Sequence, residues 1–195
     1  MKSDIVLAGV GGQGIVSIAA TIGTAALIEG LNLKQSEVHG MSQRGGDVSS
    51  NMRVSDMPIA SDLIPFGGAD LILSVEPMES LRYMPYLSEN GWLVTNSAPF
   101  INIPNYPELD ELLDSIKKLP KNIIINADAI AADLGSRRSS NIVMLGAASP
   151  FIGIKMESFE AGLRQIFERK GEKVVESNIA ALRAGRKFTE ENYKF

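Results

Sequence analysis

The clearest candidates for ligand binding are the glycines of a short turn near the amino end, Gly9-Val-Gly-Gly-Gln-Gly14. They satisfy the pattern G-x-G-x-x-G between a buried apolar run and a segment rich in Ala and Ile, the strand–turn–helix context that this pattern requires. Glycine there lets backbone N–H groups approach a phosphate at the positive end of a helix. The predicted ligand-binding residues are Gly9, Gly11, Gly12, Gln13 and Gly14.

Three interpretations of this turn stay open. A site for NAD(P) or FAD would also need an acidic residue about 20 positions onward, at the tip of the second strand, and Glu37 lies near that spacing. The turn could instead serve only close packing of a strand on a helix, or it could bind another phosphate, such as that of coenzyme A.

A second group of reactive side chains falls in one polar, glycine-rich segment, SEVHGMSQRGGD, over residues 36–47. An isolated protein gains little from such a loop, because exposed ion pairs contribute only about 0–1 kcal/mol. We therefore predict that it faces a ligand or a partner. Arg44 is suited to pairing with a carboxylate or phosphate, and His39 either adjusts charge near neutral pH or anchors the loop. The predicted loop residues are Glu37, His39, Ser42, Gln43, Arg44, Gly45 and Gly46.

Several kinds of chemistry are excluded. The chain has no cysteine, which rules out disulfides, a thiolate nucleophile and a cysteine-ligated iron–sulfur cluster within it. A single histidine makes a zinc site improbable. Gly46-Asp47 resembles the start of a thiamine diphosphate motif, but Val48 replaces its second glycine and the later asparagine pair is missing. No G-x-S-x-G motif accompanies His39, so no catalytic triad and no catalytic residue is assigned.

Buried strands and helical patterns alternate along the chain and predict an α/β fold: one Rossmann-like domain over 1–195, with a mainly parallel sheet flanked by helices. The expected strands are 4–8, 48–55, 69–75, 92–96 and 122–126, with a turn at Asn90-Gly91. The expected helices are 15–29, 76–87, 108–119, 128–134 and 141–149, and C-terminal helices fill 157–191. The small residues of 141–150 favour close packing under the sheet over a subunit contact.

The net charge of −4 and pI of about 5.1 argue against nucleic-acid binding, which needs clustered Lys and Arg. The charges after Lys155 alternate in sign and indicate solvated helix faces. No apolar stretch reaches the roughly 18 residues of a membrane span, and the first residues make a poor secretory signal. We expect a cytoplasmic protein.

Taken together, Gly9-Val-Gly-Gly-Gln-Gly-Ile15, Ser36–Gly46 and Asn141-Ile-Val-Met-Leu-Gly-Ala-Ala148 resemble the gamma-type subunit or domain of 2-oxoacid:ferredoxin oxidoreductases. The second segment is most similar to the beta subunit of indolepyruvate:ferredoxin oxidoreductase. The resemblance covers about residues 4–185.

The resemblance implies a thiamine-dependent oxidative decarboxylation of an arylpyruvate, with ferredoxin accepting electrons and coenzyme A accepting the acyl group. Thiamine diphosphate, Mg and the iron–sulfur clusters are expected on a large partner subunit, and no cofactor is expected to be firmly bound by this chain. Coenzyme A is a possible shared substrate at the glycine turn. Such a chain would be inactive alone.

Two other functions remain as alternatives: a free-standing enzyme that binds NAD(P) or FAD, and a non-catalytic module that binds a nucleotide or acyl-CoA. The lack of a recognisable catalytic set favours the subunit or the binding module over the free-standing enzyme.

Overall fold

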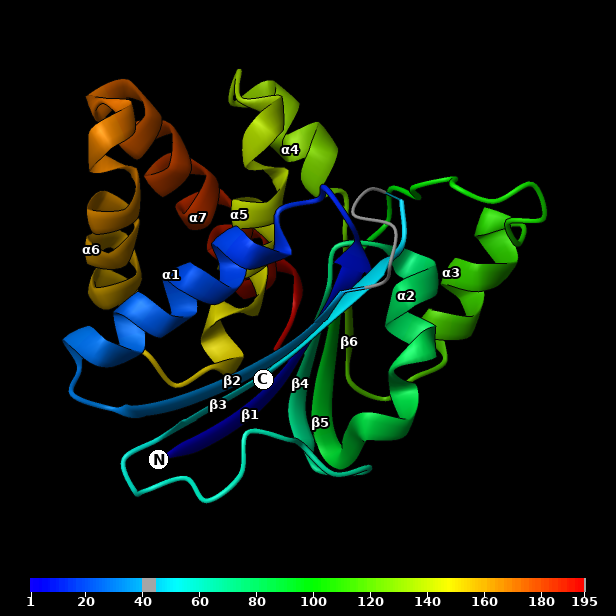
Figure 1. Cartoon of the computed structure of the whole chain (residues 1–195). Coiled ribbons are helices and arrows are strands. Elements are labelled where there is room, and N and C mark those ends of the chain that lie inside the picture. Colours follow the sequence, from blue (N-terminus) through cyan, green and yellow to red (C-terminus); the bar gives the residue numbers. More distant parts are fainter. Residues whose placement is uncertain (40–44, 195) are drawn as a thin grey trace.

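A computed structural model describes residues 1–39 and 45–194. Within these residues, six strands form one sheet in the order β2-β3-β1-β4-β5-β6 (Figure 1). The contacts β1–β4, β4–β5 and β5–β6 are parallel, whereas β3 is antiparallel to both β1 and β2. The predicted mainly parallel α/β fold is therefore confirmed. The strands are β1 (Lys2–Val10), β2 (Asn32–His39), β3 (Asp47–Ser55), β4 (Ala69–Ser74), β5 (Leu87–Asn96) and β6 (Asn122–Ile125).

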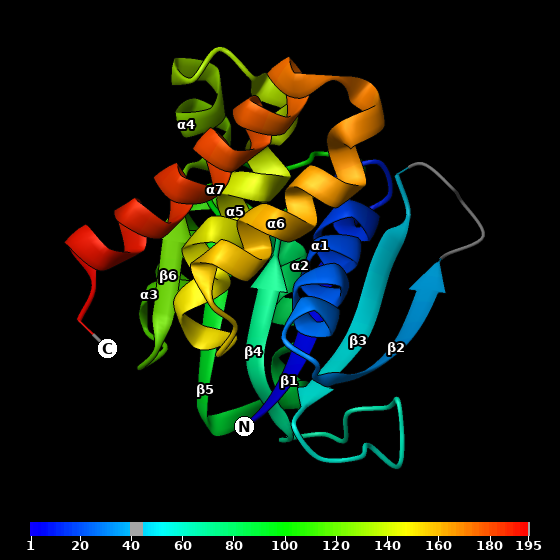
Figure 2. The ribbon, with the colours of Figure 1, turned by 90° about the vertical axis from the view of Figure 1, so that its left-hand side faces the viewer.

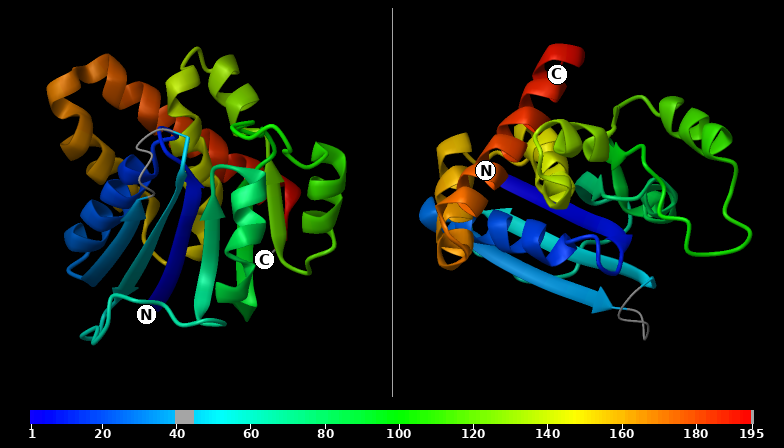
Figure 3. Two further views of the ribbon diagram at one scale, coloured as in Figure 1. Left: turned by 45° about the vertical axis from the view of Figure 1, so that its right-hand side comes forward. Right: turned by 90° about the horizontal axis from the view of Figure 1, so that it is seen from above.

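Helices cover both faces of the sheet. Helices α1, α5, α6 and α7 form the layer that faces the viewer in Figure 2, and α2 and α3 lie on the opposite face (Figures 1 and 3). The region expected to be helical at the C-terminus forms α6 and α7, which are separated near Gly171. The helices are α1 (Ile15–Ile28), α2 (Pro77–Arg82), α3 (Leu109–Lys117), α4 (Ala127–Asp133), α5 (Ser140–Ala148), α6 (Met156–Phe167) and α7 (Glu172–Asn192).

Strand β1 is buried along nearly its whole length, and the residues from Ile5 onward are apolar because the strand is covered on both faces. Ile5 and Leu7 belong to the larger core cluster under α1, α5 and α7, whereas Val6 belongs to a smaller cluster under α2 and α3. The alternation of side chains along a strand distributes neighbouring residues between the two cores.

The prediction that residues 36–47 form a loop was wrong at both of its ends. Residues up to His39 belong to the edge strand β2, and Asp47 begins β3, which pairs with it. The hydrophobic pattern indicates only a weak strand before Ser36, because Leu33 is only partly buried against the core and Val38 is 60% exposed. Backbone pairing with β3, rather than side-chain burial, makes β2 a strand.

The region between β4 and β5 also differs from the prediction. Helix α2 ends at Arg82, and a 3₁₀ turn over Met84–Tyr86 leads directly into β5, because Pro85 cannot continue an α-helix. No turn forms at Asn90-Gly91. The strand runs through Gly91, where a Cβ would lie 2.7 Å from the carbonyl oxygen of Ala69.

Helix α5 is buried from Asn141 to Ala148, as its small residues predicted. It packs against α7 at backbone distance. A Cβ on Gly146 would lie 2.0 Å from the Leu182 carbonyl oxygen, and one on Gly185 would lie 1.9 Å from that of Val143. The small residues therefore serve helix packing.

Candidate functional site

The carboxyl ends of β1 and β4 are neighbours in the sheet, and the chain leaves them toward opposite faces, through α1 and α2 respectively (Figure 1). In open α/β sheets, ligands bind in the crevice at such a point. The glycine turn follows β1, so its position in the fold is that of a ligand site.

The side chain of Gln13 links the glycine turn to both strands. Its Oε1 accepts a hydrogen bond from the Val10 N–H at 2.8 Å, and its Nε2 donates to the Val75 carbonyl oxygen at 3.4 Å. A Cβ on Gly9 would lie only 2.4 Å from Cγ2 of Val75. Gly9 and Gln13 thus hold the turn closely against the end of β4.

Left-handed backbone occurs at two positions of the turn, Gly12 (φ 104°) and Gly14 (φ 85°). Gly14 is the N-cap of α1 and has no side chain to cap the helix. Its carbonyl oxygen accepts a hydrogen bond from Nδ2 of Asn141 at 3.1 Å. The positive end of α1 is therefore open beside the turn, without a carboxylate in its first turn.

The second predicted segment meets the first. The Gly11 N–H donates to the Gly46 carbonyl oxygen at 2.8 Å, and the Gly45 N–H donates to the Gly11 carbonyl oxygen at 3.4 Å. The Gly45 carbonyl oxygen accepts a 2.6 Å bond from Nδ2 of Asn102, which lies in the proline-rich stretch after β5. The glycine turn, the Gly45-Gly46 pair and the stretch after β5 are distant in sequence, and these bonds join them at the carboxyl end of β1.

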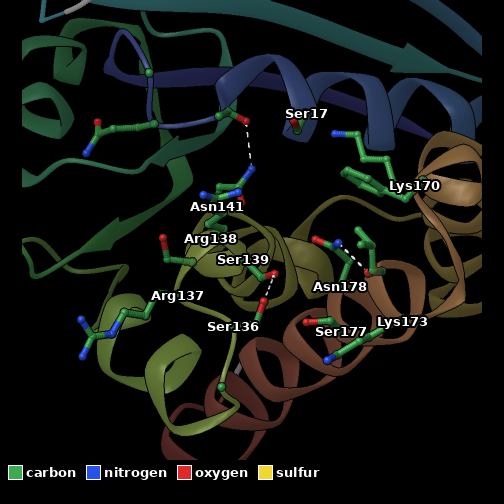
Figure 4. A pocket seen from close by; sticks show the side chains of 17 residues that line it. Ser17, Ser136, Arg137, Arg138, Ser139, Asn141, Lys170, Lys173, Ser177 and Asn178 are labelled. Atoms are coloured by element: carbon green, nitrogen blue, oxygen red, sulfur yellow. Dashed lines mark hydrogen bonds between the residues drawn. The ribbon is translucent and has the colours of Figure 1, made fainter.

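A cavity of about 710 Å³ opens beside the glycine turn (Figure 4). Its walls come from the turn and the start of α1, from the segment before α5, and from the junction of α6 and α7. The volume is within the range of sites for cofactors and drug-sized ligands. It is lined by Gly12, Gln13, Gly14, Ser17, Gly135, Ser136, Arg137, Arg138, Ser139, Ser140, Asn141, Phe167, Lys170, Lys173, Val174, Ser177 and Asn178.

Four cations and no acidic side chain line this cavity: Arg137, Arg138, Lys170 and Lys173. All four are exposed, and among the described residues none forms an ion pair with a carboxylate. Together with the open end of α1, they make a concave surface suited to an anion that carries more than one phosphate.

A smaller cavity of about 310 Å³ shares Gln13, Ser140 and Asn141 with the larger one. Asn96, at the end of β5, donates through Nδ2 to Oδ2 of Asp128 at 2.8 Å. Its Oδ1 accepts the Ala127 N–H at 3.1 Å. Carboxamides and one carboxylate thus line this second space, and Ala98, Pro99 and Phe100 close it.

Among the described residues, no group of three or more His, Asp or Glu side chains is arranged to hold a metal ion. No helix in that part of the chain combines the length and apolar character needed to cross a bilayer.

Residues 4–188 match the model of a family described as pyruvate ferredoxin/flavodoxin oxidoreductase. The chain belongs to this family. The resemblance to the gamma-type subunits of 2-oxoacid:ferredoxin oxidoreductases is confirmed.

The chain is 36% identical to the indolepyruvate oxidoreductase subunit IorB of Archaeoglobus fulgidus, covering 95% of this chain and 94% of that protein. It is also 36% identical to the same subunit of Methanothermobacter thermautotrophicus, over 95% and 96% of the two chains. The common gamma subunit of the pyruvate/ketoisovalerate oxidoreductases of Pyrococcus abyssi is 28% identical, over 85% and 87%.

Solved structures share the fold. The gamma subunit of a keto/oxoacid ferredoxin oxidoreductase from Geobacter sulfurreducens has a TM-score of 0.71 and 26% identity, over 97% of this chain and 99% of that one. A 2-oxoglutarate:ferredoxin oxidoreductase from Magnetococcus marinus, with 2-oxoglutarate, coenzyme A and succinyl-CoA bound, has a TM-score of 0.79 and 22% identity. The match covers 100% of this chain and 32% of that one.

The structure separates the predicted site residues of this oxidoreductase subunit into groups. Gly12, Gln13 and Gly14 line the large cavity, whereas Gly9 packs on Val75 and Gly11 bonds to Gly46. Three of the predicted loop residues, Ser42, Gln43 and Arg44, lie outside the described residues. His39 is the last residue of β2 and pairs with Val48.

Glu37 is not in the position that a dinucleotide would need. It lies on β2, paired with Ser50, which in turn pairs with Leu7 of β1. Strand β3 therefore separates Glu37 from β1, and at about 4.8 Å between strands the carboxyl is one strand too far away. In addition, it is level with the middle of β1 rather than with the glycine turn. The arrangement disfavours a dinucleotide site.

Sequence reasoning missed the cations of the cavity. Arg137-Arg138 precedes a helix, a recognisable signal for an anion site, but Lys170 and Lys173 were interpreted as part of a solvated helix face. The packing of α6 beside α1 and of α7 beside α5 brings them to the cavity (Figure 4).

Proposed function

We propose that the chain is the small subunit of an indolepyruvate-type 2-oxoacid:ferredoxin oxidoreductase and that it supplies a surface for coenzyme A. The thiamine diphosphate, Mg and iron–sulfur clusters belong to a large partner subunit, which passes electrons to ferredoxin. The chain alone is inactive.

The cavity beside the glycine turn is the observation that carries this proposal. Coenzyme A has a pyrophosphate and a 3′-phosphate at its nucleotide end. The cavity offers two arginines and two lysines with no opposing carboxylate in its lining, and guanidinium groups hold phosphates with paired hydrogen bonds. The chain's own residues would bind and orient the anionic end of this substrate.

The lack of ligands for iron–sulfur clusters supports their placement on the partner. The chain has no cysteine to hold iron–sulfur clusters, and its described residues contain no cluster of metal-ligating side chains. The chain's contribution is therefore substrate binding and contact with the partner that holds those groups.

Preference for an indole-bearing 2-oxoacid is supported by the relatives. Identity is 36% with indolepyruvate oxidoreductase subunits and 28% with a pyruvate/ketoisovalerate gamma subunit.

The contact with the large subunit is assigned to the segment over residues 36–46 and its surroundings. Edge strand β2 presents Val38, 60% exposed, and helix α1 presents Val16, 58% exposed, near the glycine turn. An edge strand with exposed apolar side chains is suited to pairing with another chain.

Purification of the native protein without oxygen tests this assignment. We expect a large subunit with iron–sulfur clusters and thiamine diphosphate to co-elute in stoichiometric amount. A monomer that retains a bound dinucleotide would contradict the proposal and favour a free-standing nucleotide-binding enzyme.

A further inference from the structure

The segment over residues 97–107 joins β5 to α3 without forming a helix or strand. It crosses the carboxyl edge of the sheet, and three of its residues, Ala98, Pro99 and Phe100, form a wall of the smaller cavity. Two further apolar residues are exposed, Ile101 at 72% and Ile103 at 40%. Burial of its own side chains therefore does not explain why this segment is held in place.

The buried carboxylate of Glu76 holds the segment at two points. Glu76 is 0% exposed and is the N-cap of α2, where Oε2 accepts the Glu79 N–H at 2.8 Å. Its Oε1 accepts hydrogen bonds from the Phe100 N–H at 3.3 Å and from the hydroxyl of Tyr106. A carboxylate taken out of water requires such partners, so the contact fixes the segment at Phe100 and at Tyr106.

Burial and the neighbouring Glu76 carboxylate raise the pKa of the Tyr106 hydroxyl above its ordinary value. The hydroxyl therefore keeps its proton and acts as a hydrogen-bond donor to Glu76 across the physiological range.

The middle of the segment is fixed on its other side. Asn102 donates to the Gly45 carbonyl oxygen at 2.6 Å, and the neighbouring Gly46 carbonyl oxygen accepts the Gly11 N–H at 2.8 Å. A continuous set of contacts therefore runs from the end of β4, through the segment, to the glycine turn.

We propose that Glu76 and Tyr106 are positioning residues for the ligand site at the carboxyl edge. They act by fixing the 97–107 segment as the wall of the smaller cavity, which adjoins the large cavity at Gln13, Ser140 and Asn141. The inference rests on the proposed function for the identity of the ligand, coenzyme A. Neither side chain lines either of the two cavities, so both act through the backbone that they hold.

The test uses Tyr106→Phe, which removes one hydroxyl, and Tyr193→Phe as the matched control. Tyr193 also makes a hydroxyl contact, accepting the Ile124 N–H at 3.3 Å at the far edge of the sheet. Amide hydrogen exchange is measured on each full-length chain, and the KM for coenzyme A and kcat are measured on each reconstituted complex. A third variant, Asn102→Ala, cuts the link to Gly45.

We expect exchange in 97–107 to accelerate by about tenfold in Tyr106→Phe and to stay unchanged in Tyr193→Phe. We expect KM for coenzyme A to rise by about fivefold with kcat within about twofold. In Asn102→Ala, exchange accelerates at residues 11–14 as well. Equal acceleration of 97–107 in the two tyrosine variants, or none in either, would overturn the inference.

The two proposals fail in different ways. An unchanged KM in Tyr106→Phe, beside a wild-type complex that requires coenzyme A, overturns the positioning role alone. Wild-type turnover that is independent of coenzyme A overturns the proposed function, and with it the ligand that this wall would serve.

Discussion

The backbone N–H of Gly11 donates a 2.8 Å hydrogen bond to the carbonyl oxygen of Gly46. The bond joins the glycine turn after β1 to the residues that lead into β3. The glycine turn and the described end of the second glycine-rich segment, Gly45 and Gly46, therefore meet at one edge of the sheet.

Gly12→Ala and Gly14→Ala should lower the free energy of unfolding by different amounts. Gly12→Ala should cost about 1–2 kcal/mol, because φ is 104° there but a Cβ meets nothing within 4 Å. At Gly14, a Cβ would also lie 2.5 Å from Nδ2 of Asn141, which adds about 1–3 kcal/mol of overpacking. Urea denaturation of the two variants measures the difference. Equal losses of unfolding free energy in the two variants would show that the close approach of Asn141 to Gly14 adds no destabilisation.

The contact between α5 and α7 should be sensitive to a single methyl group. Gly185→Ala should destabilise the chain by about 3 kcal/mol or more, since the new Cβ would lie 1.9 Å from the Val143 carbonyl oxygen and must push two backbones apart. Lys187→Ala on the same helix is the control, and we expect it within about 0.5 kcal/mol of wild type. Equal melting temperatures for Gly185→Ala and wild type would refute this close approach.

Asp4 should make stability depend on pH. Burial of its carboxyl opposes ionisation, but hydrogen bonds from Arg53, at 2.8 and 3.0 Å, and from Lys2 outweigh burial and hold the Asp4 pKa below its ordinary value. The resulting stabilisation is complete above the unfolded pKa of about 3.9 and is lost as the pH falls through the folded value.

Asp4→Asn should therefore cost about 1–3 kcal/mol at pH 7, and its deficit relative to wild type should shrink as the pH falls below about 4. Denaturation series at pH 7, 5 and 3.5 supply the comparison. A deficit that stayed constant over this range would mean that the carboxylate charge does not stabilise the fold.

The cations of the large cavity should determine affinity for coenzyme A. Arg138→Ala and Lys173→Ala should each raise KM for coenzyme A by about tenfold, equivalent to about 1.4 kcal/mol, with a smaller effect at high salt. Lys118→Ala removes an exposed lysine beyond α3, on the other face of the sheet, and should leave KM unchanged. If all three variants behaved alike, the cavity would not be the binding site.

Much of the fold could be predicted because its signals are local. The apolar run before Gly9 is a strand buried on both faces, and the small residues of 141–150 form a helix in backbone contact with α7. In each case the pattern of apolar and small residues within one short stretch indicates how the side chains of that stretch are buried. Such patterns need no knowledge of distant residues.

Other parts of the site could not be predicted because they depend on tertiary contacts. Strand β2 exists through its pairing with β3, so the spacing of Glu37 suggested a dinucleotide site that the strand order disfavours. Lys170 and Lys173 are far in sequence from the glycine turn and come to line the same cavity only through helix packing. The contact of Tyr106 with Glu76 likewise joins two segments that no local pattern connects.

The most direct test of the proposed subunit is turnover by the reconstituted complex. The purified chain and its large partner, separately and mixed, are supplied without oxygen with indolepyruvate, coenzyme A and oxidised ferredoxin, and ferredoxin reduction is followed by absorbance. The chain alone should give none, because it has no cysteine for iron–sulfur clusters, and the mixture should give turnover that requires both indolepyruvate and coenzyme A. Ferredoxin reduction by the isolated chain, or equal turnover by the large subunit with and without it, would contradict the assignment.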